Sequence, residues 1–547
     1  MSLDKCAGIQ TIIKAIFLQI YFQNMSANGS NSVAEENKIE VKETNSQPDV
    51  SPKPEAGSST QGTVPNDESN ISHIHEFQDE RITLSFQTQA TGQKKETMHW
   101  AIVGCSHGAM DTIYDTLRNT ERQYGFKFDL LICCGDFQAV RNMGDLQHMH
   151  VPPKYRELGT FHQYYSGQKI APVLTLFIGG NHESSGYLSE LPNGGWVAPN
   201  IYYMGYASVV QFGGMRIAGL SGIYKSHDYN RGHFERPPFN NNDPKITSAY
   251  HVRSLELFRL KQLRLRAGIT DFGDCEALLR IKPFFRQDIE QNNLGNPATM
   301  DLLYELKPNR WFSAHMHVRF PAEVEHSADK ENSTTTKFLA LDKPLPRRSW
   351  CEVLEVPRLD CDKADDTSPP LRLSYDPTWL AILRNTDFLT IVEDRRVYMP
   401  GPTNSNERHD FRPTQQELDA VSELFNNDFT IPCNFRPTAP PEQFLAGRNA
   451  RVPQSLYYRN PQSTEFCEKL GIKDFNYMLC QENPQTLGVP YYCLQQKSAP
   501  AINQANSSQA KGNPDEINIG DLDNNDEFGG ESFVIDATPA ANPTESE

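Results

Sequence analysis

Four short polar motifs, each directly after an apolar run of strand length, constrain the fold of this 547-residue chain more than any other feature. They read Cys-Ser-His, Gly-Asp, Gly-Asn-His-Glu and Ala-His-Met-His, at residues 105–107, 135–136, 180–183 and 314–317. Short apolar runs bounded by glycine and polar residues are typical of buried strands. Because helical patterns alternate with these runs, the sequence predicts a layered α/β fold with polar residues gathered outside the carboxyl ends of the strands.

The same patterns predict the order of elements from residue 98 to residue 357. Strands are expected at residues 99–103, 128–134, 173–178, 208–212, 215–220, 311–314, 338–341 and 350–356. Helices are expected at residues 110–124, 248–266, 298–306 and, beyond this region, 414–425. Each of the four motifs therefore follows a predicted strand.

The residue types in the four motifs favour a metal centre. Histidine, aspartate, asparagine and a cysteine thiolate suit two neighbouring divalent transition-metal ions, and a carboxylate oxygen can bridge the two. Asp136 is the candidate for that bridge. Two residues one position apart on a loop can turn to one site, as in Cys105 with His107 and in His315 with His317. Taken alone, Cys105 would be a small buried apolar residue, so its role as a ligand depends on the other motifs.

The combined motifs resemble those of the calcineurin-like metallophosphoesterases. Cysteine in the first motif, where most of that superfamily has aspartate, resembles the lariat debranching enzymes in particular. The segment at about 137–170, with the stretches QAVRN, VPPKYRELG and FHQYYSG, is similar to the lariat recognition loop of that family. The resemblance covers roughly residues 98–356, with a weaker similarity at 376–390. It implies an enzyme with a four-layer metallophosphoesterase sandwich, in which two mixed sheets are flanked by helices.

The resemblance also implies roles for residues of the four motifs. Asp136, Asn181 and His182 would be the catalytic residues, with His182 as a general acid or as a hydrogen-bond donor in the transition state. A thiolate in place of a carboxylate shifts the metal preference away from magnesium, so Fe²⁺, Zn²⁺ and Mn²⁺ are the candidates, with one or two ions per chain. The implied metal ligands are Cys105, His107, Asp136 and His317 for one ion, and Asp136, Asn181 and His315 for the other.

The reaction implied by the resemblance is hydrolysis of the 2′,5′-phosphodiester branch linkage of excised introns during mRNA processing. A metal-activated hydroxide would attack the phosphorus in line, and the 2′-oxygen of the branch nucleotide would leave. Branched lariat RNA would be the partner and the nucleus the location, and no membrane is implied. Side chains of the loop that could contact phosphates and unpaired bases are Lys154, Tyr155, Arg156, Tyr164 and Tyr165.

One segment of the family pattern is missing. The family has an apolar strand that ends in Ser-His-Asp-Trp, and its histidine binds the second metal, whereas Leu265 and Arg266 here lead directly into Ala267. The sequence holds no histidine between His251 and His315. We expect this apparent deletion, near residues 266–270, to leave neighbouring strands with unpaired backbone groups, to weaken the second metal position and to lower activity and stability. A splice form, an error in the gene model and a real loss of function all fit the sequence.

Two other functions are compatible with the sequence. A general phosphodiesterase or nuclease would apply the same metal chemistry to linear RNA. A catalytically silenced lariat-binding protein would keep the loop and lack turnover because of the missing histidine. Turnover of branched and linear RNA discriminates among the three functions.

The flanking regions differ from the central region in composition. Residues 25–97 are rich in Ser, Asn, Glu and Thr, and residues 1–97 as a whole are expected to be a disordered leader. The apolar stretch at 7–22 within it is too short and too polar for a membrane anchor or a clean signal peptide. Residues 358–497 are expected to be a partly ordered C-terminal debranching-enzyme region, and 498–547 an acidic disordered tail.

The formal net charge of −17 comes mainly from these flanks. Residues 98–350 hold 28 Lys and Arg against 25 Asp and Glu, a balance of +3, so the other residues carry −20. RNA therefore remains an admissible partner of the central region, because phosphates respond to the local field. The 11 cysteines are odd in number and form no CxxC pair, which favours a reducing compartment.

Overall fold

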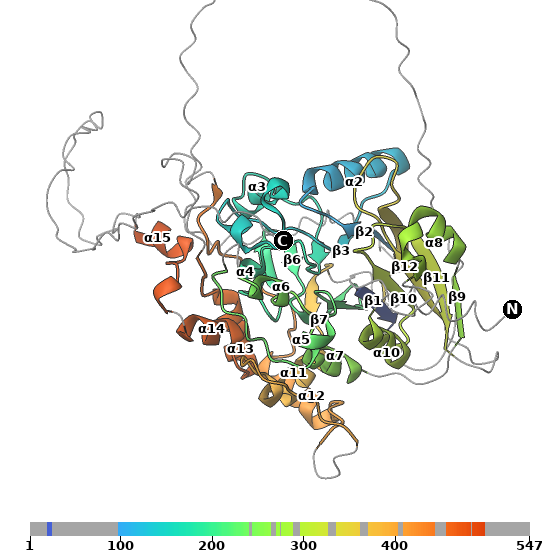
Figure 1. Cartoon of the computed structure of the whole chain (residues 1–547). Helices are drawn as coiled ribbons and strands as arrows, with labels where there is room; N and C mark the ends of the chain where they lie inside the picture. The colour runs from blue at the N-terminus through green and yellow to red at the C-terminus, as the bar shows by residue number, and fades with distance from the viewer. Residues whose placement is uncertain are drawn as a thin grey trace, which may run out of the picture. The chain divides into compact units, whose positions relative to one another are not determined.

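The computed structural model describes residues 19–24, 97–239, 243–263, 270–273, 275–287, 296–326, 335–360, 370–402, 408–442, 456–482 and 484–497 (Figure 1). Contacts divide the chain into Met1–Ser498 and Ala499–Glu547, and the second part contains no described residue. The predicted tail, and the predicted leader apart from residues 19–24 and 97, therefore lie outside the described residues.

A six-stranded sheet carries three of the four motifs. Its strands, in spatial order, are β13 (Cys351–Pro357), β2 (Thr97–Cys105), β3 (Leu130–Gly135), β4 (Thr175–Phe177), β6 (Ile201–Tyr203) and β5 (Gly195–Ala198). The four inner strands are parallel, and the two edge strands run antiparallel to their neighbours. Strands predicted at 99–103, 128–134, 173–178 and 350–356 are confirmed, whereas the sequence does not predict the very short β5 and β6.

An eight-stranded sheet carries the fourth motif. Its strands, in spatial order, are β14 (Leu373–Tyr375), β7 (Ala207–Phe212), β8 (Met215–Leu220), β1 (Gln19–Asn24), β10 (Arg310–Ser313), β12 (Thr335–Ala340), β11 (Phe320–Glu325) and β9 (Thr270–Gly273). β1 pairs antiparallel with both β8 and β10. Two predictions were therefore wrong. Residues 19–24 are not disordered, and the centre of the sheet is not left unpaired, because β1 gives backbone partners to both neighbours.

The structure has helices at three of the four predicted positions, and further helices that the sequence analysis does not predict. The helices are α2 (Met110–Tyr124), α3 (Phe161–Tyr165), α4 (Ser185–Leu188), α5 (Ser226–Tyr229), α6 (Lys245–Ser248), α7 (Ser254–Lys261), α8 (Cys275–Ile281), α10 (Pro297–Leu306), α11 (Pro377–Asn385), α12 (Gln415–Leu424), α13 (Pro461–Leu470), α14 (Phe475–Glu482) and α15 (Tyr491–Lys497). Helices predicted at 110–124, 298–306 and 414–425 are confirmed. None of the helices in the described ranges has both the length and the apolar character needed to cross a membrane.

The single helix predicted at 248–266 is wrong, because the chain breaks between α6 and α7. Arg253, just before α7, has an extended backbone, with φ −105° and ψ 157°. Its buried guanidinium group donates hydrogen bonds to the carbonyl oxygens of Ser248 at 3.1 Å and His251 at 3.2 Å. These two carbonyl groups thereby find partners outside a helix.

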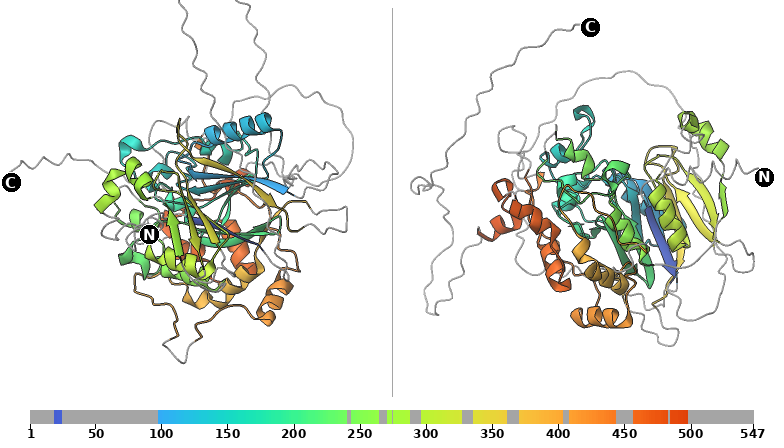
Figure 2. Two further views of the ribbon diagram at one scale, coloured as in Figure 1. Left: turned by 90° about the vertical axis from the view of Figure 1, so that its right-hand side faces the viewer. Right: turned by 60° about the horizontal axis from the view of Figure 1, so that its bottom comes forward.

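Side chains along β2 point alternately into two different cores, and this shows how the two sheets and the helices form four layers. Met98, Trp100 and Ile102 pack into the core between the sheets, which also contains residues of β7, β8 and β10. Ala101 and Val103 face the opposite core, which contains the buried face of α2. A third core joins the larger sheet to α7, α10 and α11. The order helix, sheet, sheet, helix confirms the predicted sandwich, and Figure 2 shows helices outside the strands.

The C-terminal region packs onto the smaller sheet and onto the predicted recognition loop at about 137–170. Arg141 of the loop is fully buried, and its guanidinium group donates to Oε1 of Glu190 and to Oγ1 of Thr438, both at 2.8 Å. Gln462 of α13 accepts a hydrogen bond from the amide of Trp196 at 2.8 Å and donates one to its carbonyl oxygen at 2.9 Å. The described parts of residues 370–497 are thus tied to the smaller sheet and to the segment at 137–170 by buried polar contacts.

Candidate active site

Adjacent parallel strands bring the first two motifs side by side. Cys105 is the last residue of β2 and pairs with Gly135, the last residue of β3. Beyond the strand ends, the amide of His107 donates a hydrogen bond to the carbonyl oxygen of Asp136 at 2.7 Å. The fourth motif comes from the other sheet, where the amide of His315 donates to Sγ of Cys105 at 3.0 Å. The two sheets thus meet at one site.

Four of the predicted ligands lie close enough to bind one ion. Ligand atoms of Cys105, His107, Asp136 and His317 all lie within 4.8 Å of one another. The Nε2 atoms of His107 and His317 are 3.0 Å apart, and Nε2 of His107 is 3.8 Å from Oδ2 of Asp136. Two imidazole nitrogens bound tetrahedrally to zinc would be about 3.3 Å apart. This donor set therefore fits a divalent transition metal.

The residues predicted for a second ion approach the same carboxylate. The amide of His182 donates to Oδ1 of Asp136 at 3.0 Å, which holds the third motif against Asp136. The side-chain oxygen of the neighbouring Asn181 is buried and has no hydrogen-bond partner among the described residues. An orphaned buried oxygen suits a metal ligand. With His315, the second position has three candidate donors, one fewer than the first.

Backbone conformation also marks the site. His107, Asp136, His315 and His317 have φ angles of 45°, 38°, 74° and 49°. Residues with a Cβ rarely adopt positive φ, and such conformations cost of order 1–3 kcal/mol each. Because four predicted ligands share this strain, we interpret the loops as held for function and not for the stability of the fold.

Burial favours the neutral forms of His107 and His317. It lowers the pKa of His107 to about 4 and that of His317 to about 3, although the carboxylate of Asp136 acts in the opposite direction. Burial alone would raise the pKa of Asp136, but the neighbouring histidines, His107 first, bring it below its ordinary value. Burial, and then Asp136, raise the pKa of the Cys105 thiol well above its ordinary value. Neutral imidazoles and an ionised carboxylate are the forms that bind metals, and a bound cation favours the thiolate.

Two residues of the third motif, Gly180 and Glu183, have structural roles that the sequence analysis missed. A Cβ on Gly180 would lie 2.0 Å from Oδ1 of Asp136, so the two loops can approach only at a glycine. Glu183 accepts hydrogen bonds from the amides of Phe137 at 2.6 Å and Gln138 at 2.9 Å. Burial, and then Asp136, raise the pKa of Glu183 to about 8. Glu183 thus fastens the start of the recognition loop, and its place beside the predicted catalytic residues was the signal for such a role.

Two family models match the chain. Calcineurin-like phosphoesterase matches residues 98–319, and the C-terminal domain of lariat debranching enzyme matches residues 333–475. The lariat debranching enzyme of Caenorhabditis elegans is 48% identical over 469 residues, which cover 81% of this chain and 88% of that protein. The lariat debranching enzyme of Homo sapiens is 49% identical over 394 residues, which cover 70% of each chain. The chain belongs to the lariat debranching enzyme family. It is a metal-dependent phosphodiesterase whose domain type uses divalent ions.

The predicted recognition loop of this lariat debranching enzyme family member exposes two of its predicted RNA contacts, Lys154 and Tyr155. Tyr155 is 62% exposed, and the ammonium group of the exposed Lys154 lies 4.7 Å from the centre of its ring. Arg156 is partly buried, and its Nε donates to the carbonyl oxygen of Val151 at 2.7 Å. A base can therefore reach the ring of Tyr155, with a cation beside it.

The structure does not support base stacking by Tyr164 and Tyr165. The two residues are only 3% and 2% exposed. The hydroxyl group of Tyr164 donates to Oδ1 of Asp111 at 2.7 Å, and that of Tyr165 donates to the carbonyl oxygen of Ala439 at 2.8 Å. Both rings belong to the core around α2 and α3, so no base can stack on them without opening that core.

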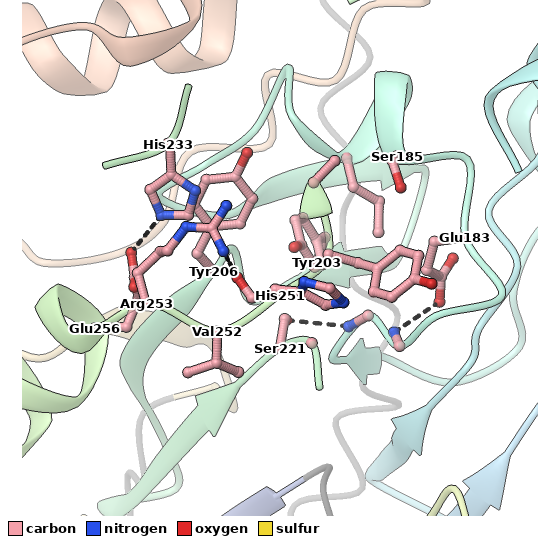
Figure 3. Close-up of a pocket in the computed structure, with 16 residues that line it drawn as sticks. Glu183, Ser185, Tyr203, Tyr206, Ser221, His233, His251, Val252, Arg253 and Glu256 are labelled. Carbon is pink, nitrogen blue, oxygen red and sulfur yellow. Dashed lines mark hydrogen bonds and ion pairs between the residues drawn. The ribbon is translucent and has the colours of Figure 1, made fainter. Parts of the chain in front are cut away.

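A small cavity lies behind the third motif (Figure 3). It has a volume of about 30 Å³, and its lining includes Glu183, Ser221, His251 and Arg253. Oγ of Ser221 accepts a hydrogen bond from the amide of Gly179 at 3.0 Å, which holds the chain just before the motif. The cavity therefore borders the loop of the third motif, and the contact with Ser221 helps to hold that loop.

Proposed function

We propose that this chain hydrolyses the 2′,5′-phosphodiester branch linkage of excised introns during mRNA processing. The observation that carries the proposal is the cluster of Cys105, His107, Asp136 and His317 at the strand ends of a chain of this family. Branched lariat RNA is the proposed substrate. The nucleus, where introns are excised, is the proposed location.

The proposed metal is Fe²⁺, Zn²⁺ or Mn²⁺. A thiolate and imidazoles are softer ligands than carboxylates alone, which disfavours magnesium. The first position would use Cys105, His107, Asp136 and His317, whose ligand atoms all lie within 4.8 Å of one another. When bound, the ion supplies Lewis-acid polarisation of the phosphoryl group and lowers the pKa of a water nucleophile.

Protein groups beside the ion would orient the phosphate and protonate the leaving group. The ring of His182 lies 5.0 Å from the ring of His107, at 84° to it, so His182 stands next to the predicted ligands. Its amide also holds the carboxylate of Asp136, which ties the proton donor and a ligand into one unit. We assign His182 as the group that donates a proton to the 2′-oxygen as the P–O bond breaks. Asn181 would bind the second ion, on the other side of the Asp136 carboxylate.

The second ion should be weakly bound in this chain. Asp136, Asn181 and His315 are its only candidate ligands in the part of the chain that the structure describes, and no histidine stands between His251 and His315 in the sequence. We propose that one ion binds tightly, that the second needs free metal in excess, and that turnover is slower than in a relative with the missing segment. Equal metal content and equal turnover in the two proteins would contradict this.

Cleavage of a synthetic 2′,5′-branched RNA tests the proposed function, with Fe²⁺, Zn²⁺ and Mn²⁺ supplied in turn. We expect branch-specific cleavage, no cleavage of a linear 3′,5′-RNA of the same sequence, and no turnover by Asp136→Asn. Equal cleavage of the linear RNA would identify a general nuclease. Binding of branched RNA without turnover in the presence of every metal would identify a silenced lariat-binding protein.

A further inference from the structure

The centre of the larger sheet is formed by a segment far from the rest of the sheet in sequence. β1 lies between β8 and β10 (Figures 1 and 2). Against β8, its register runs from Gln19 opposite Leu220 to Asn24 opposite Met215. Against β10, it runs from Gln19 opposite Ser313 to Phe22 opposite Arg310. Both edges of β1 are therefore used for pairing.

This strand comes from outside the regions that match the family models. Those matches cover residues 98–319 and 333–475, whereas β1 ends at residue 24. Among the described residues between β8 and β10 in the chain, one strand occurs, β9, and it pairs with β11 at the far edge of the sheet. No described segment of the matched regions occupies the central place.

The neighbours of β1 are buried and could not remain unpaired without cost. Ile217 and Ala218 of β8 are fully buried, and Trp311 and Phe312 of β10 are at most 2% exposed. Backbone groups that are buried without a partner destabilise a fold by about the value of a lost hydrogen bond each. A gap between β8 and β10 would leave a row of such groups on both strands.

We infer that residues 19–24 are an integral strand of the catalytic domain, supplied by the N-terminal segment of the same chain to the centre of its sheet. Residues 25–96 connect β1 to β2, a length more than sufficient to reach across a domain. Residues 19–24 are thus a structural part of the enzyme and not a dispensable segment.

The direction of β1 has a consequence for the metal centre. Because β1 is antiparallel to β10, Gln19 pairs with Ser313 at the end of the sheet near the metal ligands. Ser313 lies two positions before His315 in the sequence. Residues 1–24 contain no histidine. The segment therefore completes the sheet and adds no imidazole ligand to the second metal position.

Cleavage of the linker in the full-length protein tests the inference independently of any enzymatic activity. A specific protease site is inserted between residues 60 and 61, cut after folding, and the products are separated by gel filtration. We expect fragment 1–60 to remain bound to the rest of the chain. Release of the fragment, with unchanged hydrogen exchange at β8 and β10, would overturn the inference.

Proline substitutions in β1 give a second test. Ile20→Pro with Phe22→Pro removes two backbone donors from the strand, whereas Ser26→Pro with Asn28→Pro makes the same change outside it. We expect amides of β8 and β10 to exchange at least tenfold faster in the first variant only, and its cut fragment to dissociate. Equal exchange in both variants would show that the sheet does not depend on β1.

Discussion

Replacing Gly180 by alanine should damage the metal centre through one close contact. The added Cβ would lie 2.0 Å from Oδ1 of Asp136 and 2.9 Å from both its Cγ and its amide nitrogen. Ordinary contact between such atoms needs about 3.5 Å, so the carboxylate or its loop must move by more than about 1 Å. The carboxylate cannot simply rotate away, because it is buried and Oδ1 accepts a hydrogen bond from the amide of His182.

The expected cost of Gly180→Ala follows from this displacement. Overpacking of this kind destabilises a protein by about 1–3 kcal/mol. Metal ligands tolerate changes of only about 0.2 Å, and even groups that merely orient a ligand change metal affinity by about 10–100-fold. We therefore expect metal affinity and kcat/KM on branched RNA each to fall at least tenfold, with the protein still folded.

Equilibrium dialysis with metal analysis measures the affinity, and a branched-RNA assay measures kcat/KM. The matched control is Gly401→Ala, since a Cβ at Gly401 would meet no atom within 4 Å. The control should match the wild type in thermal unfolding, metal content and turnover. If Gly180→Ala also binds metal and turns over like the wild type, the close approach of the two loops does not position Asp136.

Other substitutions separate structural residues of the recognition loop from residues that contact RNA. Arg141→Met should lower the free energy of unfolding in urea by about 3–5 kcal/mol, because it leaves buried carboxylates without their cation, and a loss under 1 kcal/mol would contradict this. Tyr155→Ala should weaken binding of branched RNA by about 1–3 kcal/mol in a fluorescence assay, as expected for loss of one stacked base. Tyr165→Phe should leave RNA affinity unchanged and lower stability by about 1–2 kcal/mol, and the reverse result for the two tyrosines would show that the loop binds RNA through its buried side. Burial lowers the pKa of His148 from 6.5 to about 4, although Asp145 opposes this. As the pH falls, the unfolded state therefore binds the proton before the folded state does. The contribution of His148 to the free energy of unfolding is complete above about pH 6.5 and decreases towards pH 4, with a loss of about 2 kcal/mol at pH 5. His148→Gln should lack this part of the pH dependence, and an unchanged pH profile would exclude His148 as its source.

The candidate site could be predicted from the sequence because its signals are local. Each motif directly follows an apolar run, and parallel strands bring their carboxyl ends to one edge of a sheet. The structure accordingly places Cys105, His107, Asp136 and His317 together. The bounds of α2 were also readable, because its apolar spacing stops at Gly125, whose left-handed conformation ends the helix.

What the sequence did not reveal depends on contacts between distant residues. The paired neighbours of Gln19 are Leu220 and Ser313, about two hundred or more positions away, and nothing within residues 19–24 specifies them. The tyrosines of the loop pose the same problem, because the partner of the Tyr165 hydroxyl group is Ala439. Composition alone could not distinguish this buried tyrosine from the exposed Tyr155.

Hydrolysis of a branched RNA in H₂¹⁸O, with mass analysis of the products, tests the proposed chemistry most directly. Attack of water on phosphorus with departure of the 2′-oxygen predicts one ¹⁸O atom in a 5′-phosphate on the released strand and a free 2′-hydroxyl group on the branch nucleotide. His107→Ala, which removes a ligand from the first metal position, should abolish this product. A phosphate left on the 2′-oxygen, or the labelled product formed undiminished by His107→Ala, would contradict debranching at this metal centre.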